Sequence, residues 1–270
     1  MPAHHSPFTI AHSPDSDDAY MMAPLALGWL DTEGFSFRFV RADIETLNAE
    51  ALEGRYEVTA ISFGAYPELV DSYEILTAGS SIQEGTGPLV VSRTPMTAQD
   101  LRGVTVAIPG FRTSAYLTLR KWMPDLKVEL LPFDQIMPAV KAGRFEAGLL
   151  IHESQLLYRQ EGLHLVADLG AWWKQEYDLP LPMGGNAIRK GLPEDLKLRF
   201  ANLMRRSVEM AMARHEESVA YAQSFGRGMD SEMVGRYVRA WVNDFTVDPG
   251  PRGRAAVAKL LGMDVAWVQG

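Results

Sequence analysis

The chain contains no cysteine among its 270 residues. This absence excludes disulfide bonds, thiolate nucleophiles and metals held by cysteine. No run of apolar residues approaches the roughly 20 that a membrane-spanning helix needs. The N-terminal segment also lacks the basic and apolar regions of a secretion signal. We therefore expect a cytoplasmic protein with no stable membrane association.

Positive charge is also scarce, because 26 Lys and Arg residues face 34 Asp and Glu residues, for a net charge of −8. This balance argues against nucleic acid or an acidic membrane surface as a partner. A glycine-rich phosphate loop, a dinucleotide-binding fingerprint and a GxSxG nucleophile motif are all missing, so nothing in the sequence indicates a nucleotide cofactor. The length exceeds what one hydrophobic core usually serves, which predicts two lobes.

The predicted secondary structure repeats along the chain. In the first half, strands at 8–11, 35–40 and 58–61 alternate with helices at 18–27 and 44–52. In the second half, strands at 104–108, 128–131 and 148–151 alternate with helices at 114–122 and 136–142. The step from the last helix to the last strand also matches in sequence, with Glu53-Gly-Arg-Tyr-Glu57 beside Ala142-Gly-Arg-Phe-Glu146. The repeat predicts two βαβαβ units.

Two such units predict an α/β fold with two lobes facing each other across a central cleft. The Gly- and Pro-rich segments 85–93 and 179–188 are expected to cross between the lobes and to serve as hinges. The helical patterns that follow residue 193 are expected to pack back on the first lobe. We therefore divide the chain into a large discontinuous lobe, residues 1–91 plus 184–270, and a small lobe, residues 92–183.

The apolar run 148–151 ends on His152 and Glu153. Ligand sites in open α/β sheets lie at the carboxyl ends of strands. A histidine has an ordinary pKa close to neutrality, which suits it to proton abstraction, and Glu153 is a plausible partner that would orient the imidazole. In the plainer interpretation, His152 only caps the next helix or pairs with Glu153.

The repeat places further polar groups at the cleft. Ser62 ends the strand that corresponds to the one before His152. Thr113 and Ser114 begin a helix, and their hydroxyl groups at its positive end suit a ligand carboxylate, with simple helix capping as the alternative.

The acidic segment 15–18 would repel an anion, but it could accept hydrogen bonds from substrate hydroxyls or stabilise its own helix. A metal site with His12 is a third option, which the absence of calcium-loop and HExxH patterns disfavours. Trp172 and Trp173 could stack on a flat ligand or divide between core and surface.

Several of these segments together resemble one known family. They are Ser13-Pro14 with Asp18, Asp43-Ile-Glu-Thr-Leu-Asn48, Ala51-Leu-Glu-Gly54, Gly87-Pro-Leu-Val-Val91, Gly148-Leu-Leu-Ile-His-Glu-Ser154, Asp168-Leu-Gly-Ala-Trp-Trp173 and Leu179-Pro-Leu-Pro182. Over nearly its whole length the chain resembles the 1,4-dihydroxy-6-naphthoate synthases of the futalosine route to menaquinone. The resemblance implies a two-lobe fold like that of the type II periplasmic binding proteins.

The resemblance also implies a lyase that needs neither cofactor nor metal and acts on a small-molecule carboxylate, cyclic dehypoxanthinyl futalosine. The family histidine that matches His152 removes a proton from the substrate. Cleavage of a carbon–carbon bond then releases dihydroxyacetone and leaves the dihydroxynaphthoate. The family's substrate contacts fall on the segment Ala60-Ile61-Ser62 and the pair Thr113-Ser114, to which we add Ser13, Asp18 and Glu153 as expected contacts.

The chain departs from the family pattern at two places. The family's first loop usually reads SPCPNDTF, whereas this chain has Ser13-Pro-Asp-Ser-Asp-Asp-Ala-Tyr20, and Ala60 stands where a lysine is often found. Changed substrate contacts are therefore expected. Two other functions stay open, a binding protein for a small anion without catalysis and a chorismate dehydratase of the same fold. The oligomeric state is also open, with a dimer as one option.

Overall fold

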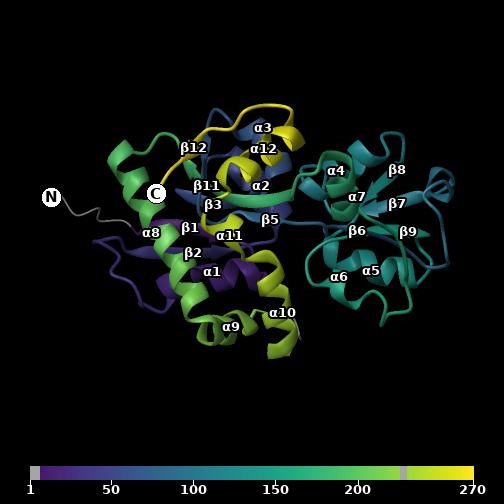
Figure 1. Ribbon diagram of the computed structural model, residues 1–270, viewed down its shortest axis with the longest axis horizontal. Coiled ribbons are helices and arrows are strands. Elements are labelled where there is room, and N and C mark those ends of the chain that lie inside the picture. Colours follow the sequence, from purple (N-terminus) through teal and green to yellow (C-terminus); the bar gives the residue numbers. More distant parts are fainter. Residues whose placement is uncertain (1–6, 226–229) are drawn as a thin grey trace.

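The computed structural model describes residues 7–225 and 230–270, which form two lobes side by side (Figure 1). Each lobe is built on one mixed β-sheet, so the predicted α/β class is confirmed. Strands β6 and β11 belong to the two segments that connect the lobes, and Figure 1 shows β6 within the smaller lobe and β11 within the larger one.

The sheet of the larger lobe has the strand order β12-β4-β11-β3-β1-β2, and β5 pairs with β11 beside this path. Strands β1, β2 and β3 are parallel, whereas β11 runs antiparallel to β3, β4 and β5. The bounds are β1 Phe8–His12, β2 Phe37–Arg41, β3 Val58–Ser62, β4 Tyr73–Leu76, β5 Ser81–Gln83, β11 Leu181–Arg189 and β12 Trp267–Val268.

The sheet of the smaller lobe has the order β10-β6-β9-β7-β8. Strands β7, β8 and β9 are parallel, and β6 runs antiparallel to β9 and β10. The bounds are β6 Leu89–Ser92, β7 Thr105–Ile108, β8 Lys127–Leu130, β9 Ala147–Leu150 and β10 His164–Asp168. Residues 89–91 thus pair in the smaller sheet, although the sequence-based division of the chain assigns them to the large lobe. Residues 181–183 likewise belong to β11 of the larger sheet, although the division assigns them to the small lobe.

The internal repeat is present in the structure. Each sheet has the first strand of its unit at the centre of a parallel trio, β2-β1-β3 in one lobe and β8-β7-β9 in the other. In each lobe an antiparallel strand from a connecting segment pairs with the last strand of the trio, β11 with β3 and β6 with β9. The matching topology brings the ends of β1 and β3 and the ends of β7 and β9 to corresponding places.

Helices cover both faces of the larger sheet. On one face, α1 packs against α8, α9 and α10, which confirms that the C-terminal helices return to the first lobe (Figure 1). The other face is covered by α2, α3 and α12. The bounds are α1 Ser16–Ala26, α2 Ile44–Leu52, α3 Tyr66–Leu69, α8 Glu194–Ala213, α9 His215–Gln223, α10 Ser231–Trp241, α11 Asp244–Val247 and α12 Gly250–Leu261, with a 3-10 turn η1 at Phe63–Ala65.

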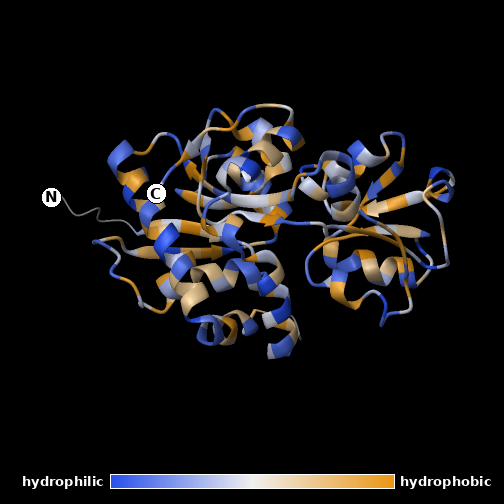
Figure 2. Cartoon of the chain, viewed as in Figure 1, coloured by the Kyte–Doolittle hydropathy of each residue, from blue (hydrophilic) through white to orange (hydrophobic). Residues whose placement is uncertain are grey.

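In the smaller lobe, α4 and α7 pack on one face of the sheet and α5 packs on the other. The strands of both sheets are largely hydrophobic, while the outer helix faces are hydrophilic (Figure 2). The bounds are α4 Ser114–Trp122, α5 Phe133–Lys141, α6 Ser154–Leu157 and α7 Leu169–Tyr177, with a 3-10 turn η2 at Asp100–Gly103. Among the described residues, no helix is long and apolar enough to cross a membrane.

Two predicted helix starts are wrong by two or three residues. Helix α1 begins at Ser16 rather than Asp18, and α5 begins at Phe133 rather than Ile136. Each of these first turns contains an acidic residue, Asp17 in α1 and Asp134 in α5. A periodic apolar pattern indicates that a helix exists better than it indicates the residue at which the helix begins.

Candidate active site

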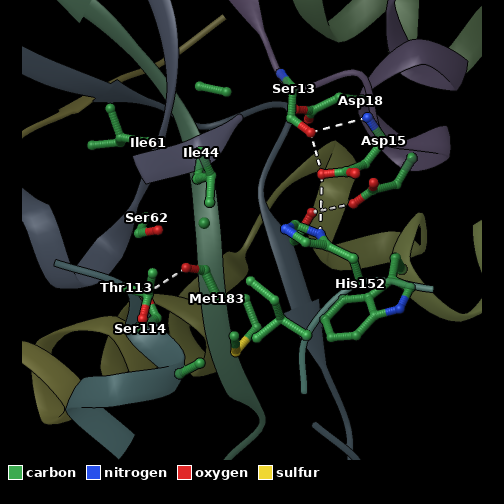
Figure 3. A pocket seen from close by; sticks show the side chains of 18 of the residues that line it. Ser13, Asp15, Asp18, Ile44, Ile61, Ser62, Thr113, Ser114, His152 and Met183 are labelled. Atoms are coloured by element: carbon green, nitrogen blue, oxygen red, sulfur yellow. Dashed lines mark hydrogen bonds and ion pairs between the residues drawn. The ribbon is translucent and has the colours of Figure 1, made fainter. Parts of the chain in front are cut away.

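A pocket in the cleft takes its walls from both lobes (Figure 3). Its empty volume is about 670 Å³, part of which is open to solvent. The larger lobe contributes the β1–α1 loop, the end of β3 and helix α10, and the smaller lobe contributes the start of α4 and the residues after β9. The lining includes eight of the predicted site residues, which are Ser13, Asp18, Ala60, Ile61, Ser62, Thr113, Ser114 and His152.

The β1–α1 loop holds its carboxylates in place with hydrogen bonds of its own. The Ser13 hydroxyl donates to Oδ2 of Asp15 and accepts from the Asp15 backbone N–H at 3.0 Å. The Ser13 backbone N–H donates to Oδ2 of Asp18 at 2.9 Å. Asp15 is the residue before α1, yet its side chain makes no capping bond to the helix. The Asp15 carboxylate instead makes a contact across the cleft.

That contact is with His152, whose Nδ1 lies 3.0 Å from Oδ2 of Asp15 (Figure 3). The His152 ring also meets Phe133 edge-on, with 5.0 Å between the ring centroids. The backbone of His152 has φ 55°, a left-handed conformation that costs a non-glycine residue about 1–2 kcal/mol. Strained residues of this kind gather at functional sites, where the surrounding structure holds them.

The structure brings a carboxylate to the imidazole that the sequence did not indicate, Asp15 from the other lobe. The orienting role expected of Glu153 remains a prediction. Glu153 is 6% exposed and does not belong to the pocket lining. It is close enough to the acidic loop for its charge to help raise the pKa of Asp17.

Ser62, at the end of β3, is held by a buried asparagine of α2. The Asn48 amide donates to the Ser62 hydroxyl at 3.3 Å, and the Asn48 carbonyl oxygen accepts from the Ser62 N–H at 2.9 Å. Asp43 is the N-cap of α2, because its side chain accepts hydrogen bonds from two N–H groups in the first turn of that helix. The cap fixes the start of the helix that carries Asn48.

The start of α4 shows that capping and a place in the pocket coexist. The Thr113 hydroxyl accepts from the Tyr116 N–H at 3.1 Å and donates to the Gly110 carbonyl at 2.9 Å, so Thr113 is the N-cap. The Ser114 hydroxyl accepts from the Gly64 N–H at 3.0 Å and donates to the Met183 carbonyl oxygen. Both residues still line the pocket. Ser114 thereby links the smaller lobe to two segments of the larger sheet region.

The two lobes touch backbone to backbone at Gly64. A Cβ atom on this residue would lie 2.7 Å from the Arg112 carbonyl oxygen and 2.9 Å from the carbonyl group of Thr113. Beside this contact, Arg112 and Glu68 form an ion pair between the lobes, with Nε and Oε1 3.1 Å apart. The cleft is therefore closed around the pocket on the side of α4.

Burial changes the acidity of the β1–α1 loop. Desolvation, aided by the charge of Asp15, raises the pKa of Asp18 to about 7. Desolvation and the charges of the neighbouring carboxylates raise the pKa of Asp17 well above its ordinary value. Burial, together with the charges of these carboxylates and Glu153, also raises the pKa of Tyr237. The loop is therefore less negative near neutral pH than its sequence suggests, and its protonated carboxyls can donate hydrogen bonds.

Sequence reasoning missed part of the lining. Tyr237 and Trp241 of α10 line the pocket, although apolar residues at helical spacing usually indicate a face packed on the core. Of the tryptophan pair, Trp173 is fully buried and donates to the Pro180 carbonyl at 3.0 Å, while Trp172 is partly exposed. Neither tryptophan of this pair lines the pocket.

His12, which belonged to the disfavoured option of a metal site at the acidic segment, is buried, and its Nδ1 donates to the Ser13 carbonyl oxygen at 2.7 Å. Burial lowers the pKa of His12 to about 4, so the imidazole is neutral at pH 7. Within residues 7–225 and 230–270, no group of three or more histidine and acidic side chains is arranged to hold a metal ion.

The fold and the pocket define a two-lobed α/β protein of the periplasmic-binding-protein type. A Candida albicans protein with the generic periplasmic binding protein fold superposes with a TM-score of 0.73, at 10% identity over 95% of this chain and 89% of that one. A crystal structure of a protein from Archaeoglobus fulgidus superposes with a TM-score of 0.91, at 41% identity over 96% of this chain and 97% of that one.

Sequence comparison gives the family. A family model described as menaquinone biosynthesis matches residues 8–265. The 1,4-dihydroxy-6-naphthoate synthase of Thermus thermophilus is 38% identical over 93% of this chain and 92% of its own length. The synthase of Streptomyces coelicolor is 35% identical over 93% of this chain and 90% of its own. The chain belongs to this family of menaquinone-biosynthesis enzymes, as the motifs had indicated.

Proposed function

We propose that the protein is a 1,4-dihydroxy-6-naphthoate synthase, a carbon–carbon lyase, and that His152 is its general base. The activity rests on the names of the two relatives, which share more than a third of their residues with this chain. The observation that supports the base is the position of His152, which lines the pocket with one ring nitrogen bound to a carboxylate. The proposed substrate is cyclic dehypoxanthinyl futalosine.

The partner of Nδ1 decides which nitrogen serves as the base. An ionised carboxylate only accepts hydrogen bonds, so Nδ1 carries the proton when it meets Asp15. In the neutral imidazole the other nitrogen, Nε2, then has a free lone pair. Nε2 takes a proton from the substrate, and the carbon–carbon bond to the sugar-derived fragment breaks with its electron pair going to that fragment. The protonated imidazole then returns the proton to the fragment. Dihydroxyacetone leaves, and the aromatic dihydroxynaphthoate remains.

The charges of the pocket suggest how the substrate lies. The N-terminus of α4 carries the positive end of the helix dipole, which suits the substrate carboxylate. The opposite wall contains Asp15, Asp17 and Asp18, whose oxygens can accept hydrogen bonds from the sugar-derived hydroxyls. In this orientation the sugar-derived end of the substrate, where the bond breaks, lies on the side of the pocket where His152 meets Asp15.

The test is a single-turnover reaction of cyclic dehypoxanthinyl futalosine with the wild type and with His152→Ala, followed by the absorbance of the product. We expect a loss of roughly 10²–10⁴-fold or more in rate, the usual contribution of a general base, with substrate binding retained. An exposed histidine of the smaller lobe, changed in His164→Ala, provides the matched control. Tight binding without turnover by the wild type would instead indicate a binding protein, and turnover of chorismate would indicate a dehydratase.

A further inference from the structure

The histidine proposed as the base and the carboxylate that meets it belong to different lobes. His152 follows β9 of the smaller sheet, whereas Asp15 lies between β1 and α1 of the larger one. Their contact of 3.0 Å therefore spans the cleft, as Figure 3 shows at the edge of the pocket. Separating the lobes would break it.

The carboxylate is fixed from its own side. The Asp15 side chain is 4% exposed, so water hardly competes for it. The oxygen that meets the imidazole is the same Oδ2 that accepts a hydrogen bond from the Ser13 hydroxyl. The backbone N–H of Ser13 in turn donates a hydrogen bond to Oδ2 of Asp18 at 2.9 Å. A buried carboxylate with this support has little freedom to turn away from the ring.

The imidazole is held from the opposite side. Phe133 of the same lobe packs edge-on against the ring, and the His152 side chain is 18% exposed. When the Gln155 amide is oriented so that its nitrogen donates to the Gly87 carbonyl oxygen, its oxygen accepts from the backbone N–H of His152 at 3.2 Å. The smaller lobe thus sets where the ring lies. None of these contacts from the smaller lobe determines which ring nitrogen carries the proton.

We propose that Asp15 is a positioning residue, which acts from the larger lobe to fix the Nδ1–H tautomer of His152 and leaves Nε2 free for the substrate. The inference rests on the proposed function, because it takes His152 to be the base. Since the contact spans the cleft, the base has its working tautomer only while the lobes are together. Proton abstraction is then confined to the closed pocket, where water is largely excluded.

A purely structural role for Asp15, as one more tie between the lobes, makes a different prediction. Asp15→Asn keeps the shape of the side chain and a polar contact to the ring. It adds an N–H donor, however, which can bind an unprotonated Nδ1 and so favour the opposite tautomer. If Asp15 only connects the lobes, Asp15→Asn should weaken substrate binding. If Asp15 fixes the tautomer, the variant should slow the reaction of bound substrate.

The experiment compares wild type, Asp15→Asn and the matched control Asp125→Asn, which changes an exposed loop aspartate of the smaller lobe. We expect kcat of Asp15→Asn to fall by roughly 10²–10⁴-fold, as a wrong tautomer does in serine proteases, with KM changed by less than about threefold. In long-range ¹H–¹⁵N spectra of histidine-labelled protein above pH 7, His152 should change from the Nδ1–H form. Its signal is identified by its absence from His152→Ala.

Unchanged kcat and an unchanged tautomer in Asp15→Asn would overturn the inference. A rise in KM alone, with the tautomer unchanged, would also overturn it and assign Asp15 to structure. If Asp15→Asn does not fold, Ser13→Ala decides by the same two measurements, because it removes the hydroxyl that holds the carboxylate. Equal activity of wild type and His152→Ala would refute the proposed base itself, whereas an inactive His152→Ala beside an active Asp15→Asn refutes only the role of Asp15.

Discussion

The two lobes present the same backbone arrangement to the cleft but give it different charge. In each βαβαβ unit, the loop between the first strand and the first helix reaches the pocket. In the larger lobe the end of this loop and the first turn of α1 carry Asp15, Asp17 and Asp18, and in the smaller lobe Thr113 and Ser114 stand at the start of α4. A helix N-terminus attracts anions through its dipole and its unpaired N–H groups. The aspartates of the first turn oppose that attraction at α1, whereas the first turn of α4 contains no acidic residue.

The difference teaches how a repeated fold can orient a substrate. Two equal helix ends would bind a carboxylate in either of two directions. With one end occupied by carboxyl groups of the protein, only the end at Thr113 and Ser114 suits a substrate carboxylate. The second pair of equivalent positions differs as well, because Ser62 has an ordinary extended conformation while His152 is left-handed. The smaller lobe thus provides both the anion end and the strained histidine.

Among the variants that test this difference between the lobes, the largest effect is expected from making the two helix starts alike. Thr113→Asp keeps a good N-cap on α4 but places a negative charge at the start of that helix. We expect KM to rise by roughly 10- to 100-fold, because a like charge about 4 Å from the substrate carboxylate costs about 1–4 kcal/mol. Steady-state kinetics at low salt provide the measurement.

The matched control for this variant is Thr113→Ser, which keeps the hydroxyl bonds to Gly110 and Tyr116 and should behave as the wild type. Thermal unfolding of both variants separates a loss of binding from a loss of structure. Wild-type KM in a folded Thr113→Asp protein would show that the substrate carboxylate does not lie at α4.

A smaller effect is expected on stability when the acidic loop is neutralised at Asp18. Burial raises the pKa of Asp18 to about 7 in the folded protein, so folding opposes its ionisation. The wild type should therefore lose stability as pH rises from the ordinary pKa of an aspartate to about 7. Asp18→Asn cannot ionise and should have a Tm higher by roughly 5 °C at pH 8, since 1 kcal/mol shifts Tm by about 2–4 °C at this size.

At pH 4 the two proteins should unfold at nearly the same temperature, because Asp18 is then protonated in the folded wild type. Calorimetry or circular dichroism across pH 4 to 8 measures the difference. A Tm of Asp18→Asn that lies below the wild type at pH 8 would show that the ionised carboxylate stabilises the loop, contrary to this account.

The smallest effect is expected at the ion pair between the lobes. The Arg112 and Glu68 side chains are 34% and 50% exposed, and such pairs contribute about 0–1 kcal/mol. Glu68→Gln should change kcat/KM by less than about fivefold, and high salt should reduce the difference. Kinetics at low and high salt measure it. A larger change that salt does not affect would mean that this pair, rather than the pocket, controls closure.

The fold was largely predictable because its pattern is local. Glycine after the last helical turn, followed by an aromatic residue and a buried strand, occurs at both Gly54 and Gly143, and it marked the ends of matching units. The ends of strands and the starts of helices were then enough to bring Ser62, Thr113 and His152 into one pocket.

The partner of His152 was not predictable in the same way. Glu153 is adjacent in sequence, but Asp15 reaches the imidazole through the packing of two lobes that sequence periodicity does not describe. The left-handed backbone at His152 could not be predicted either, because a histidine does not indicate a positive φ in the way that a glycine does. Tyr237 and Trp241 show the same limit, since the apolar face of a helix can line a pocket as well as a core.

Gly64 has an evolutionary consequence. Its φ lies outside the left-handed region, so the local backbone of η1 would accept an alanine. The obstacle is the carbonyl groups of Arg112 and Thr113, which belong to the other lobe. The methyl group of an alanine at this position would push these carbonyl groups away and widen the cleft. Selection at this position should therefore act on how closely the lobes approach, so that drift here would change the width of the pocket before it changed the fold.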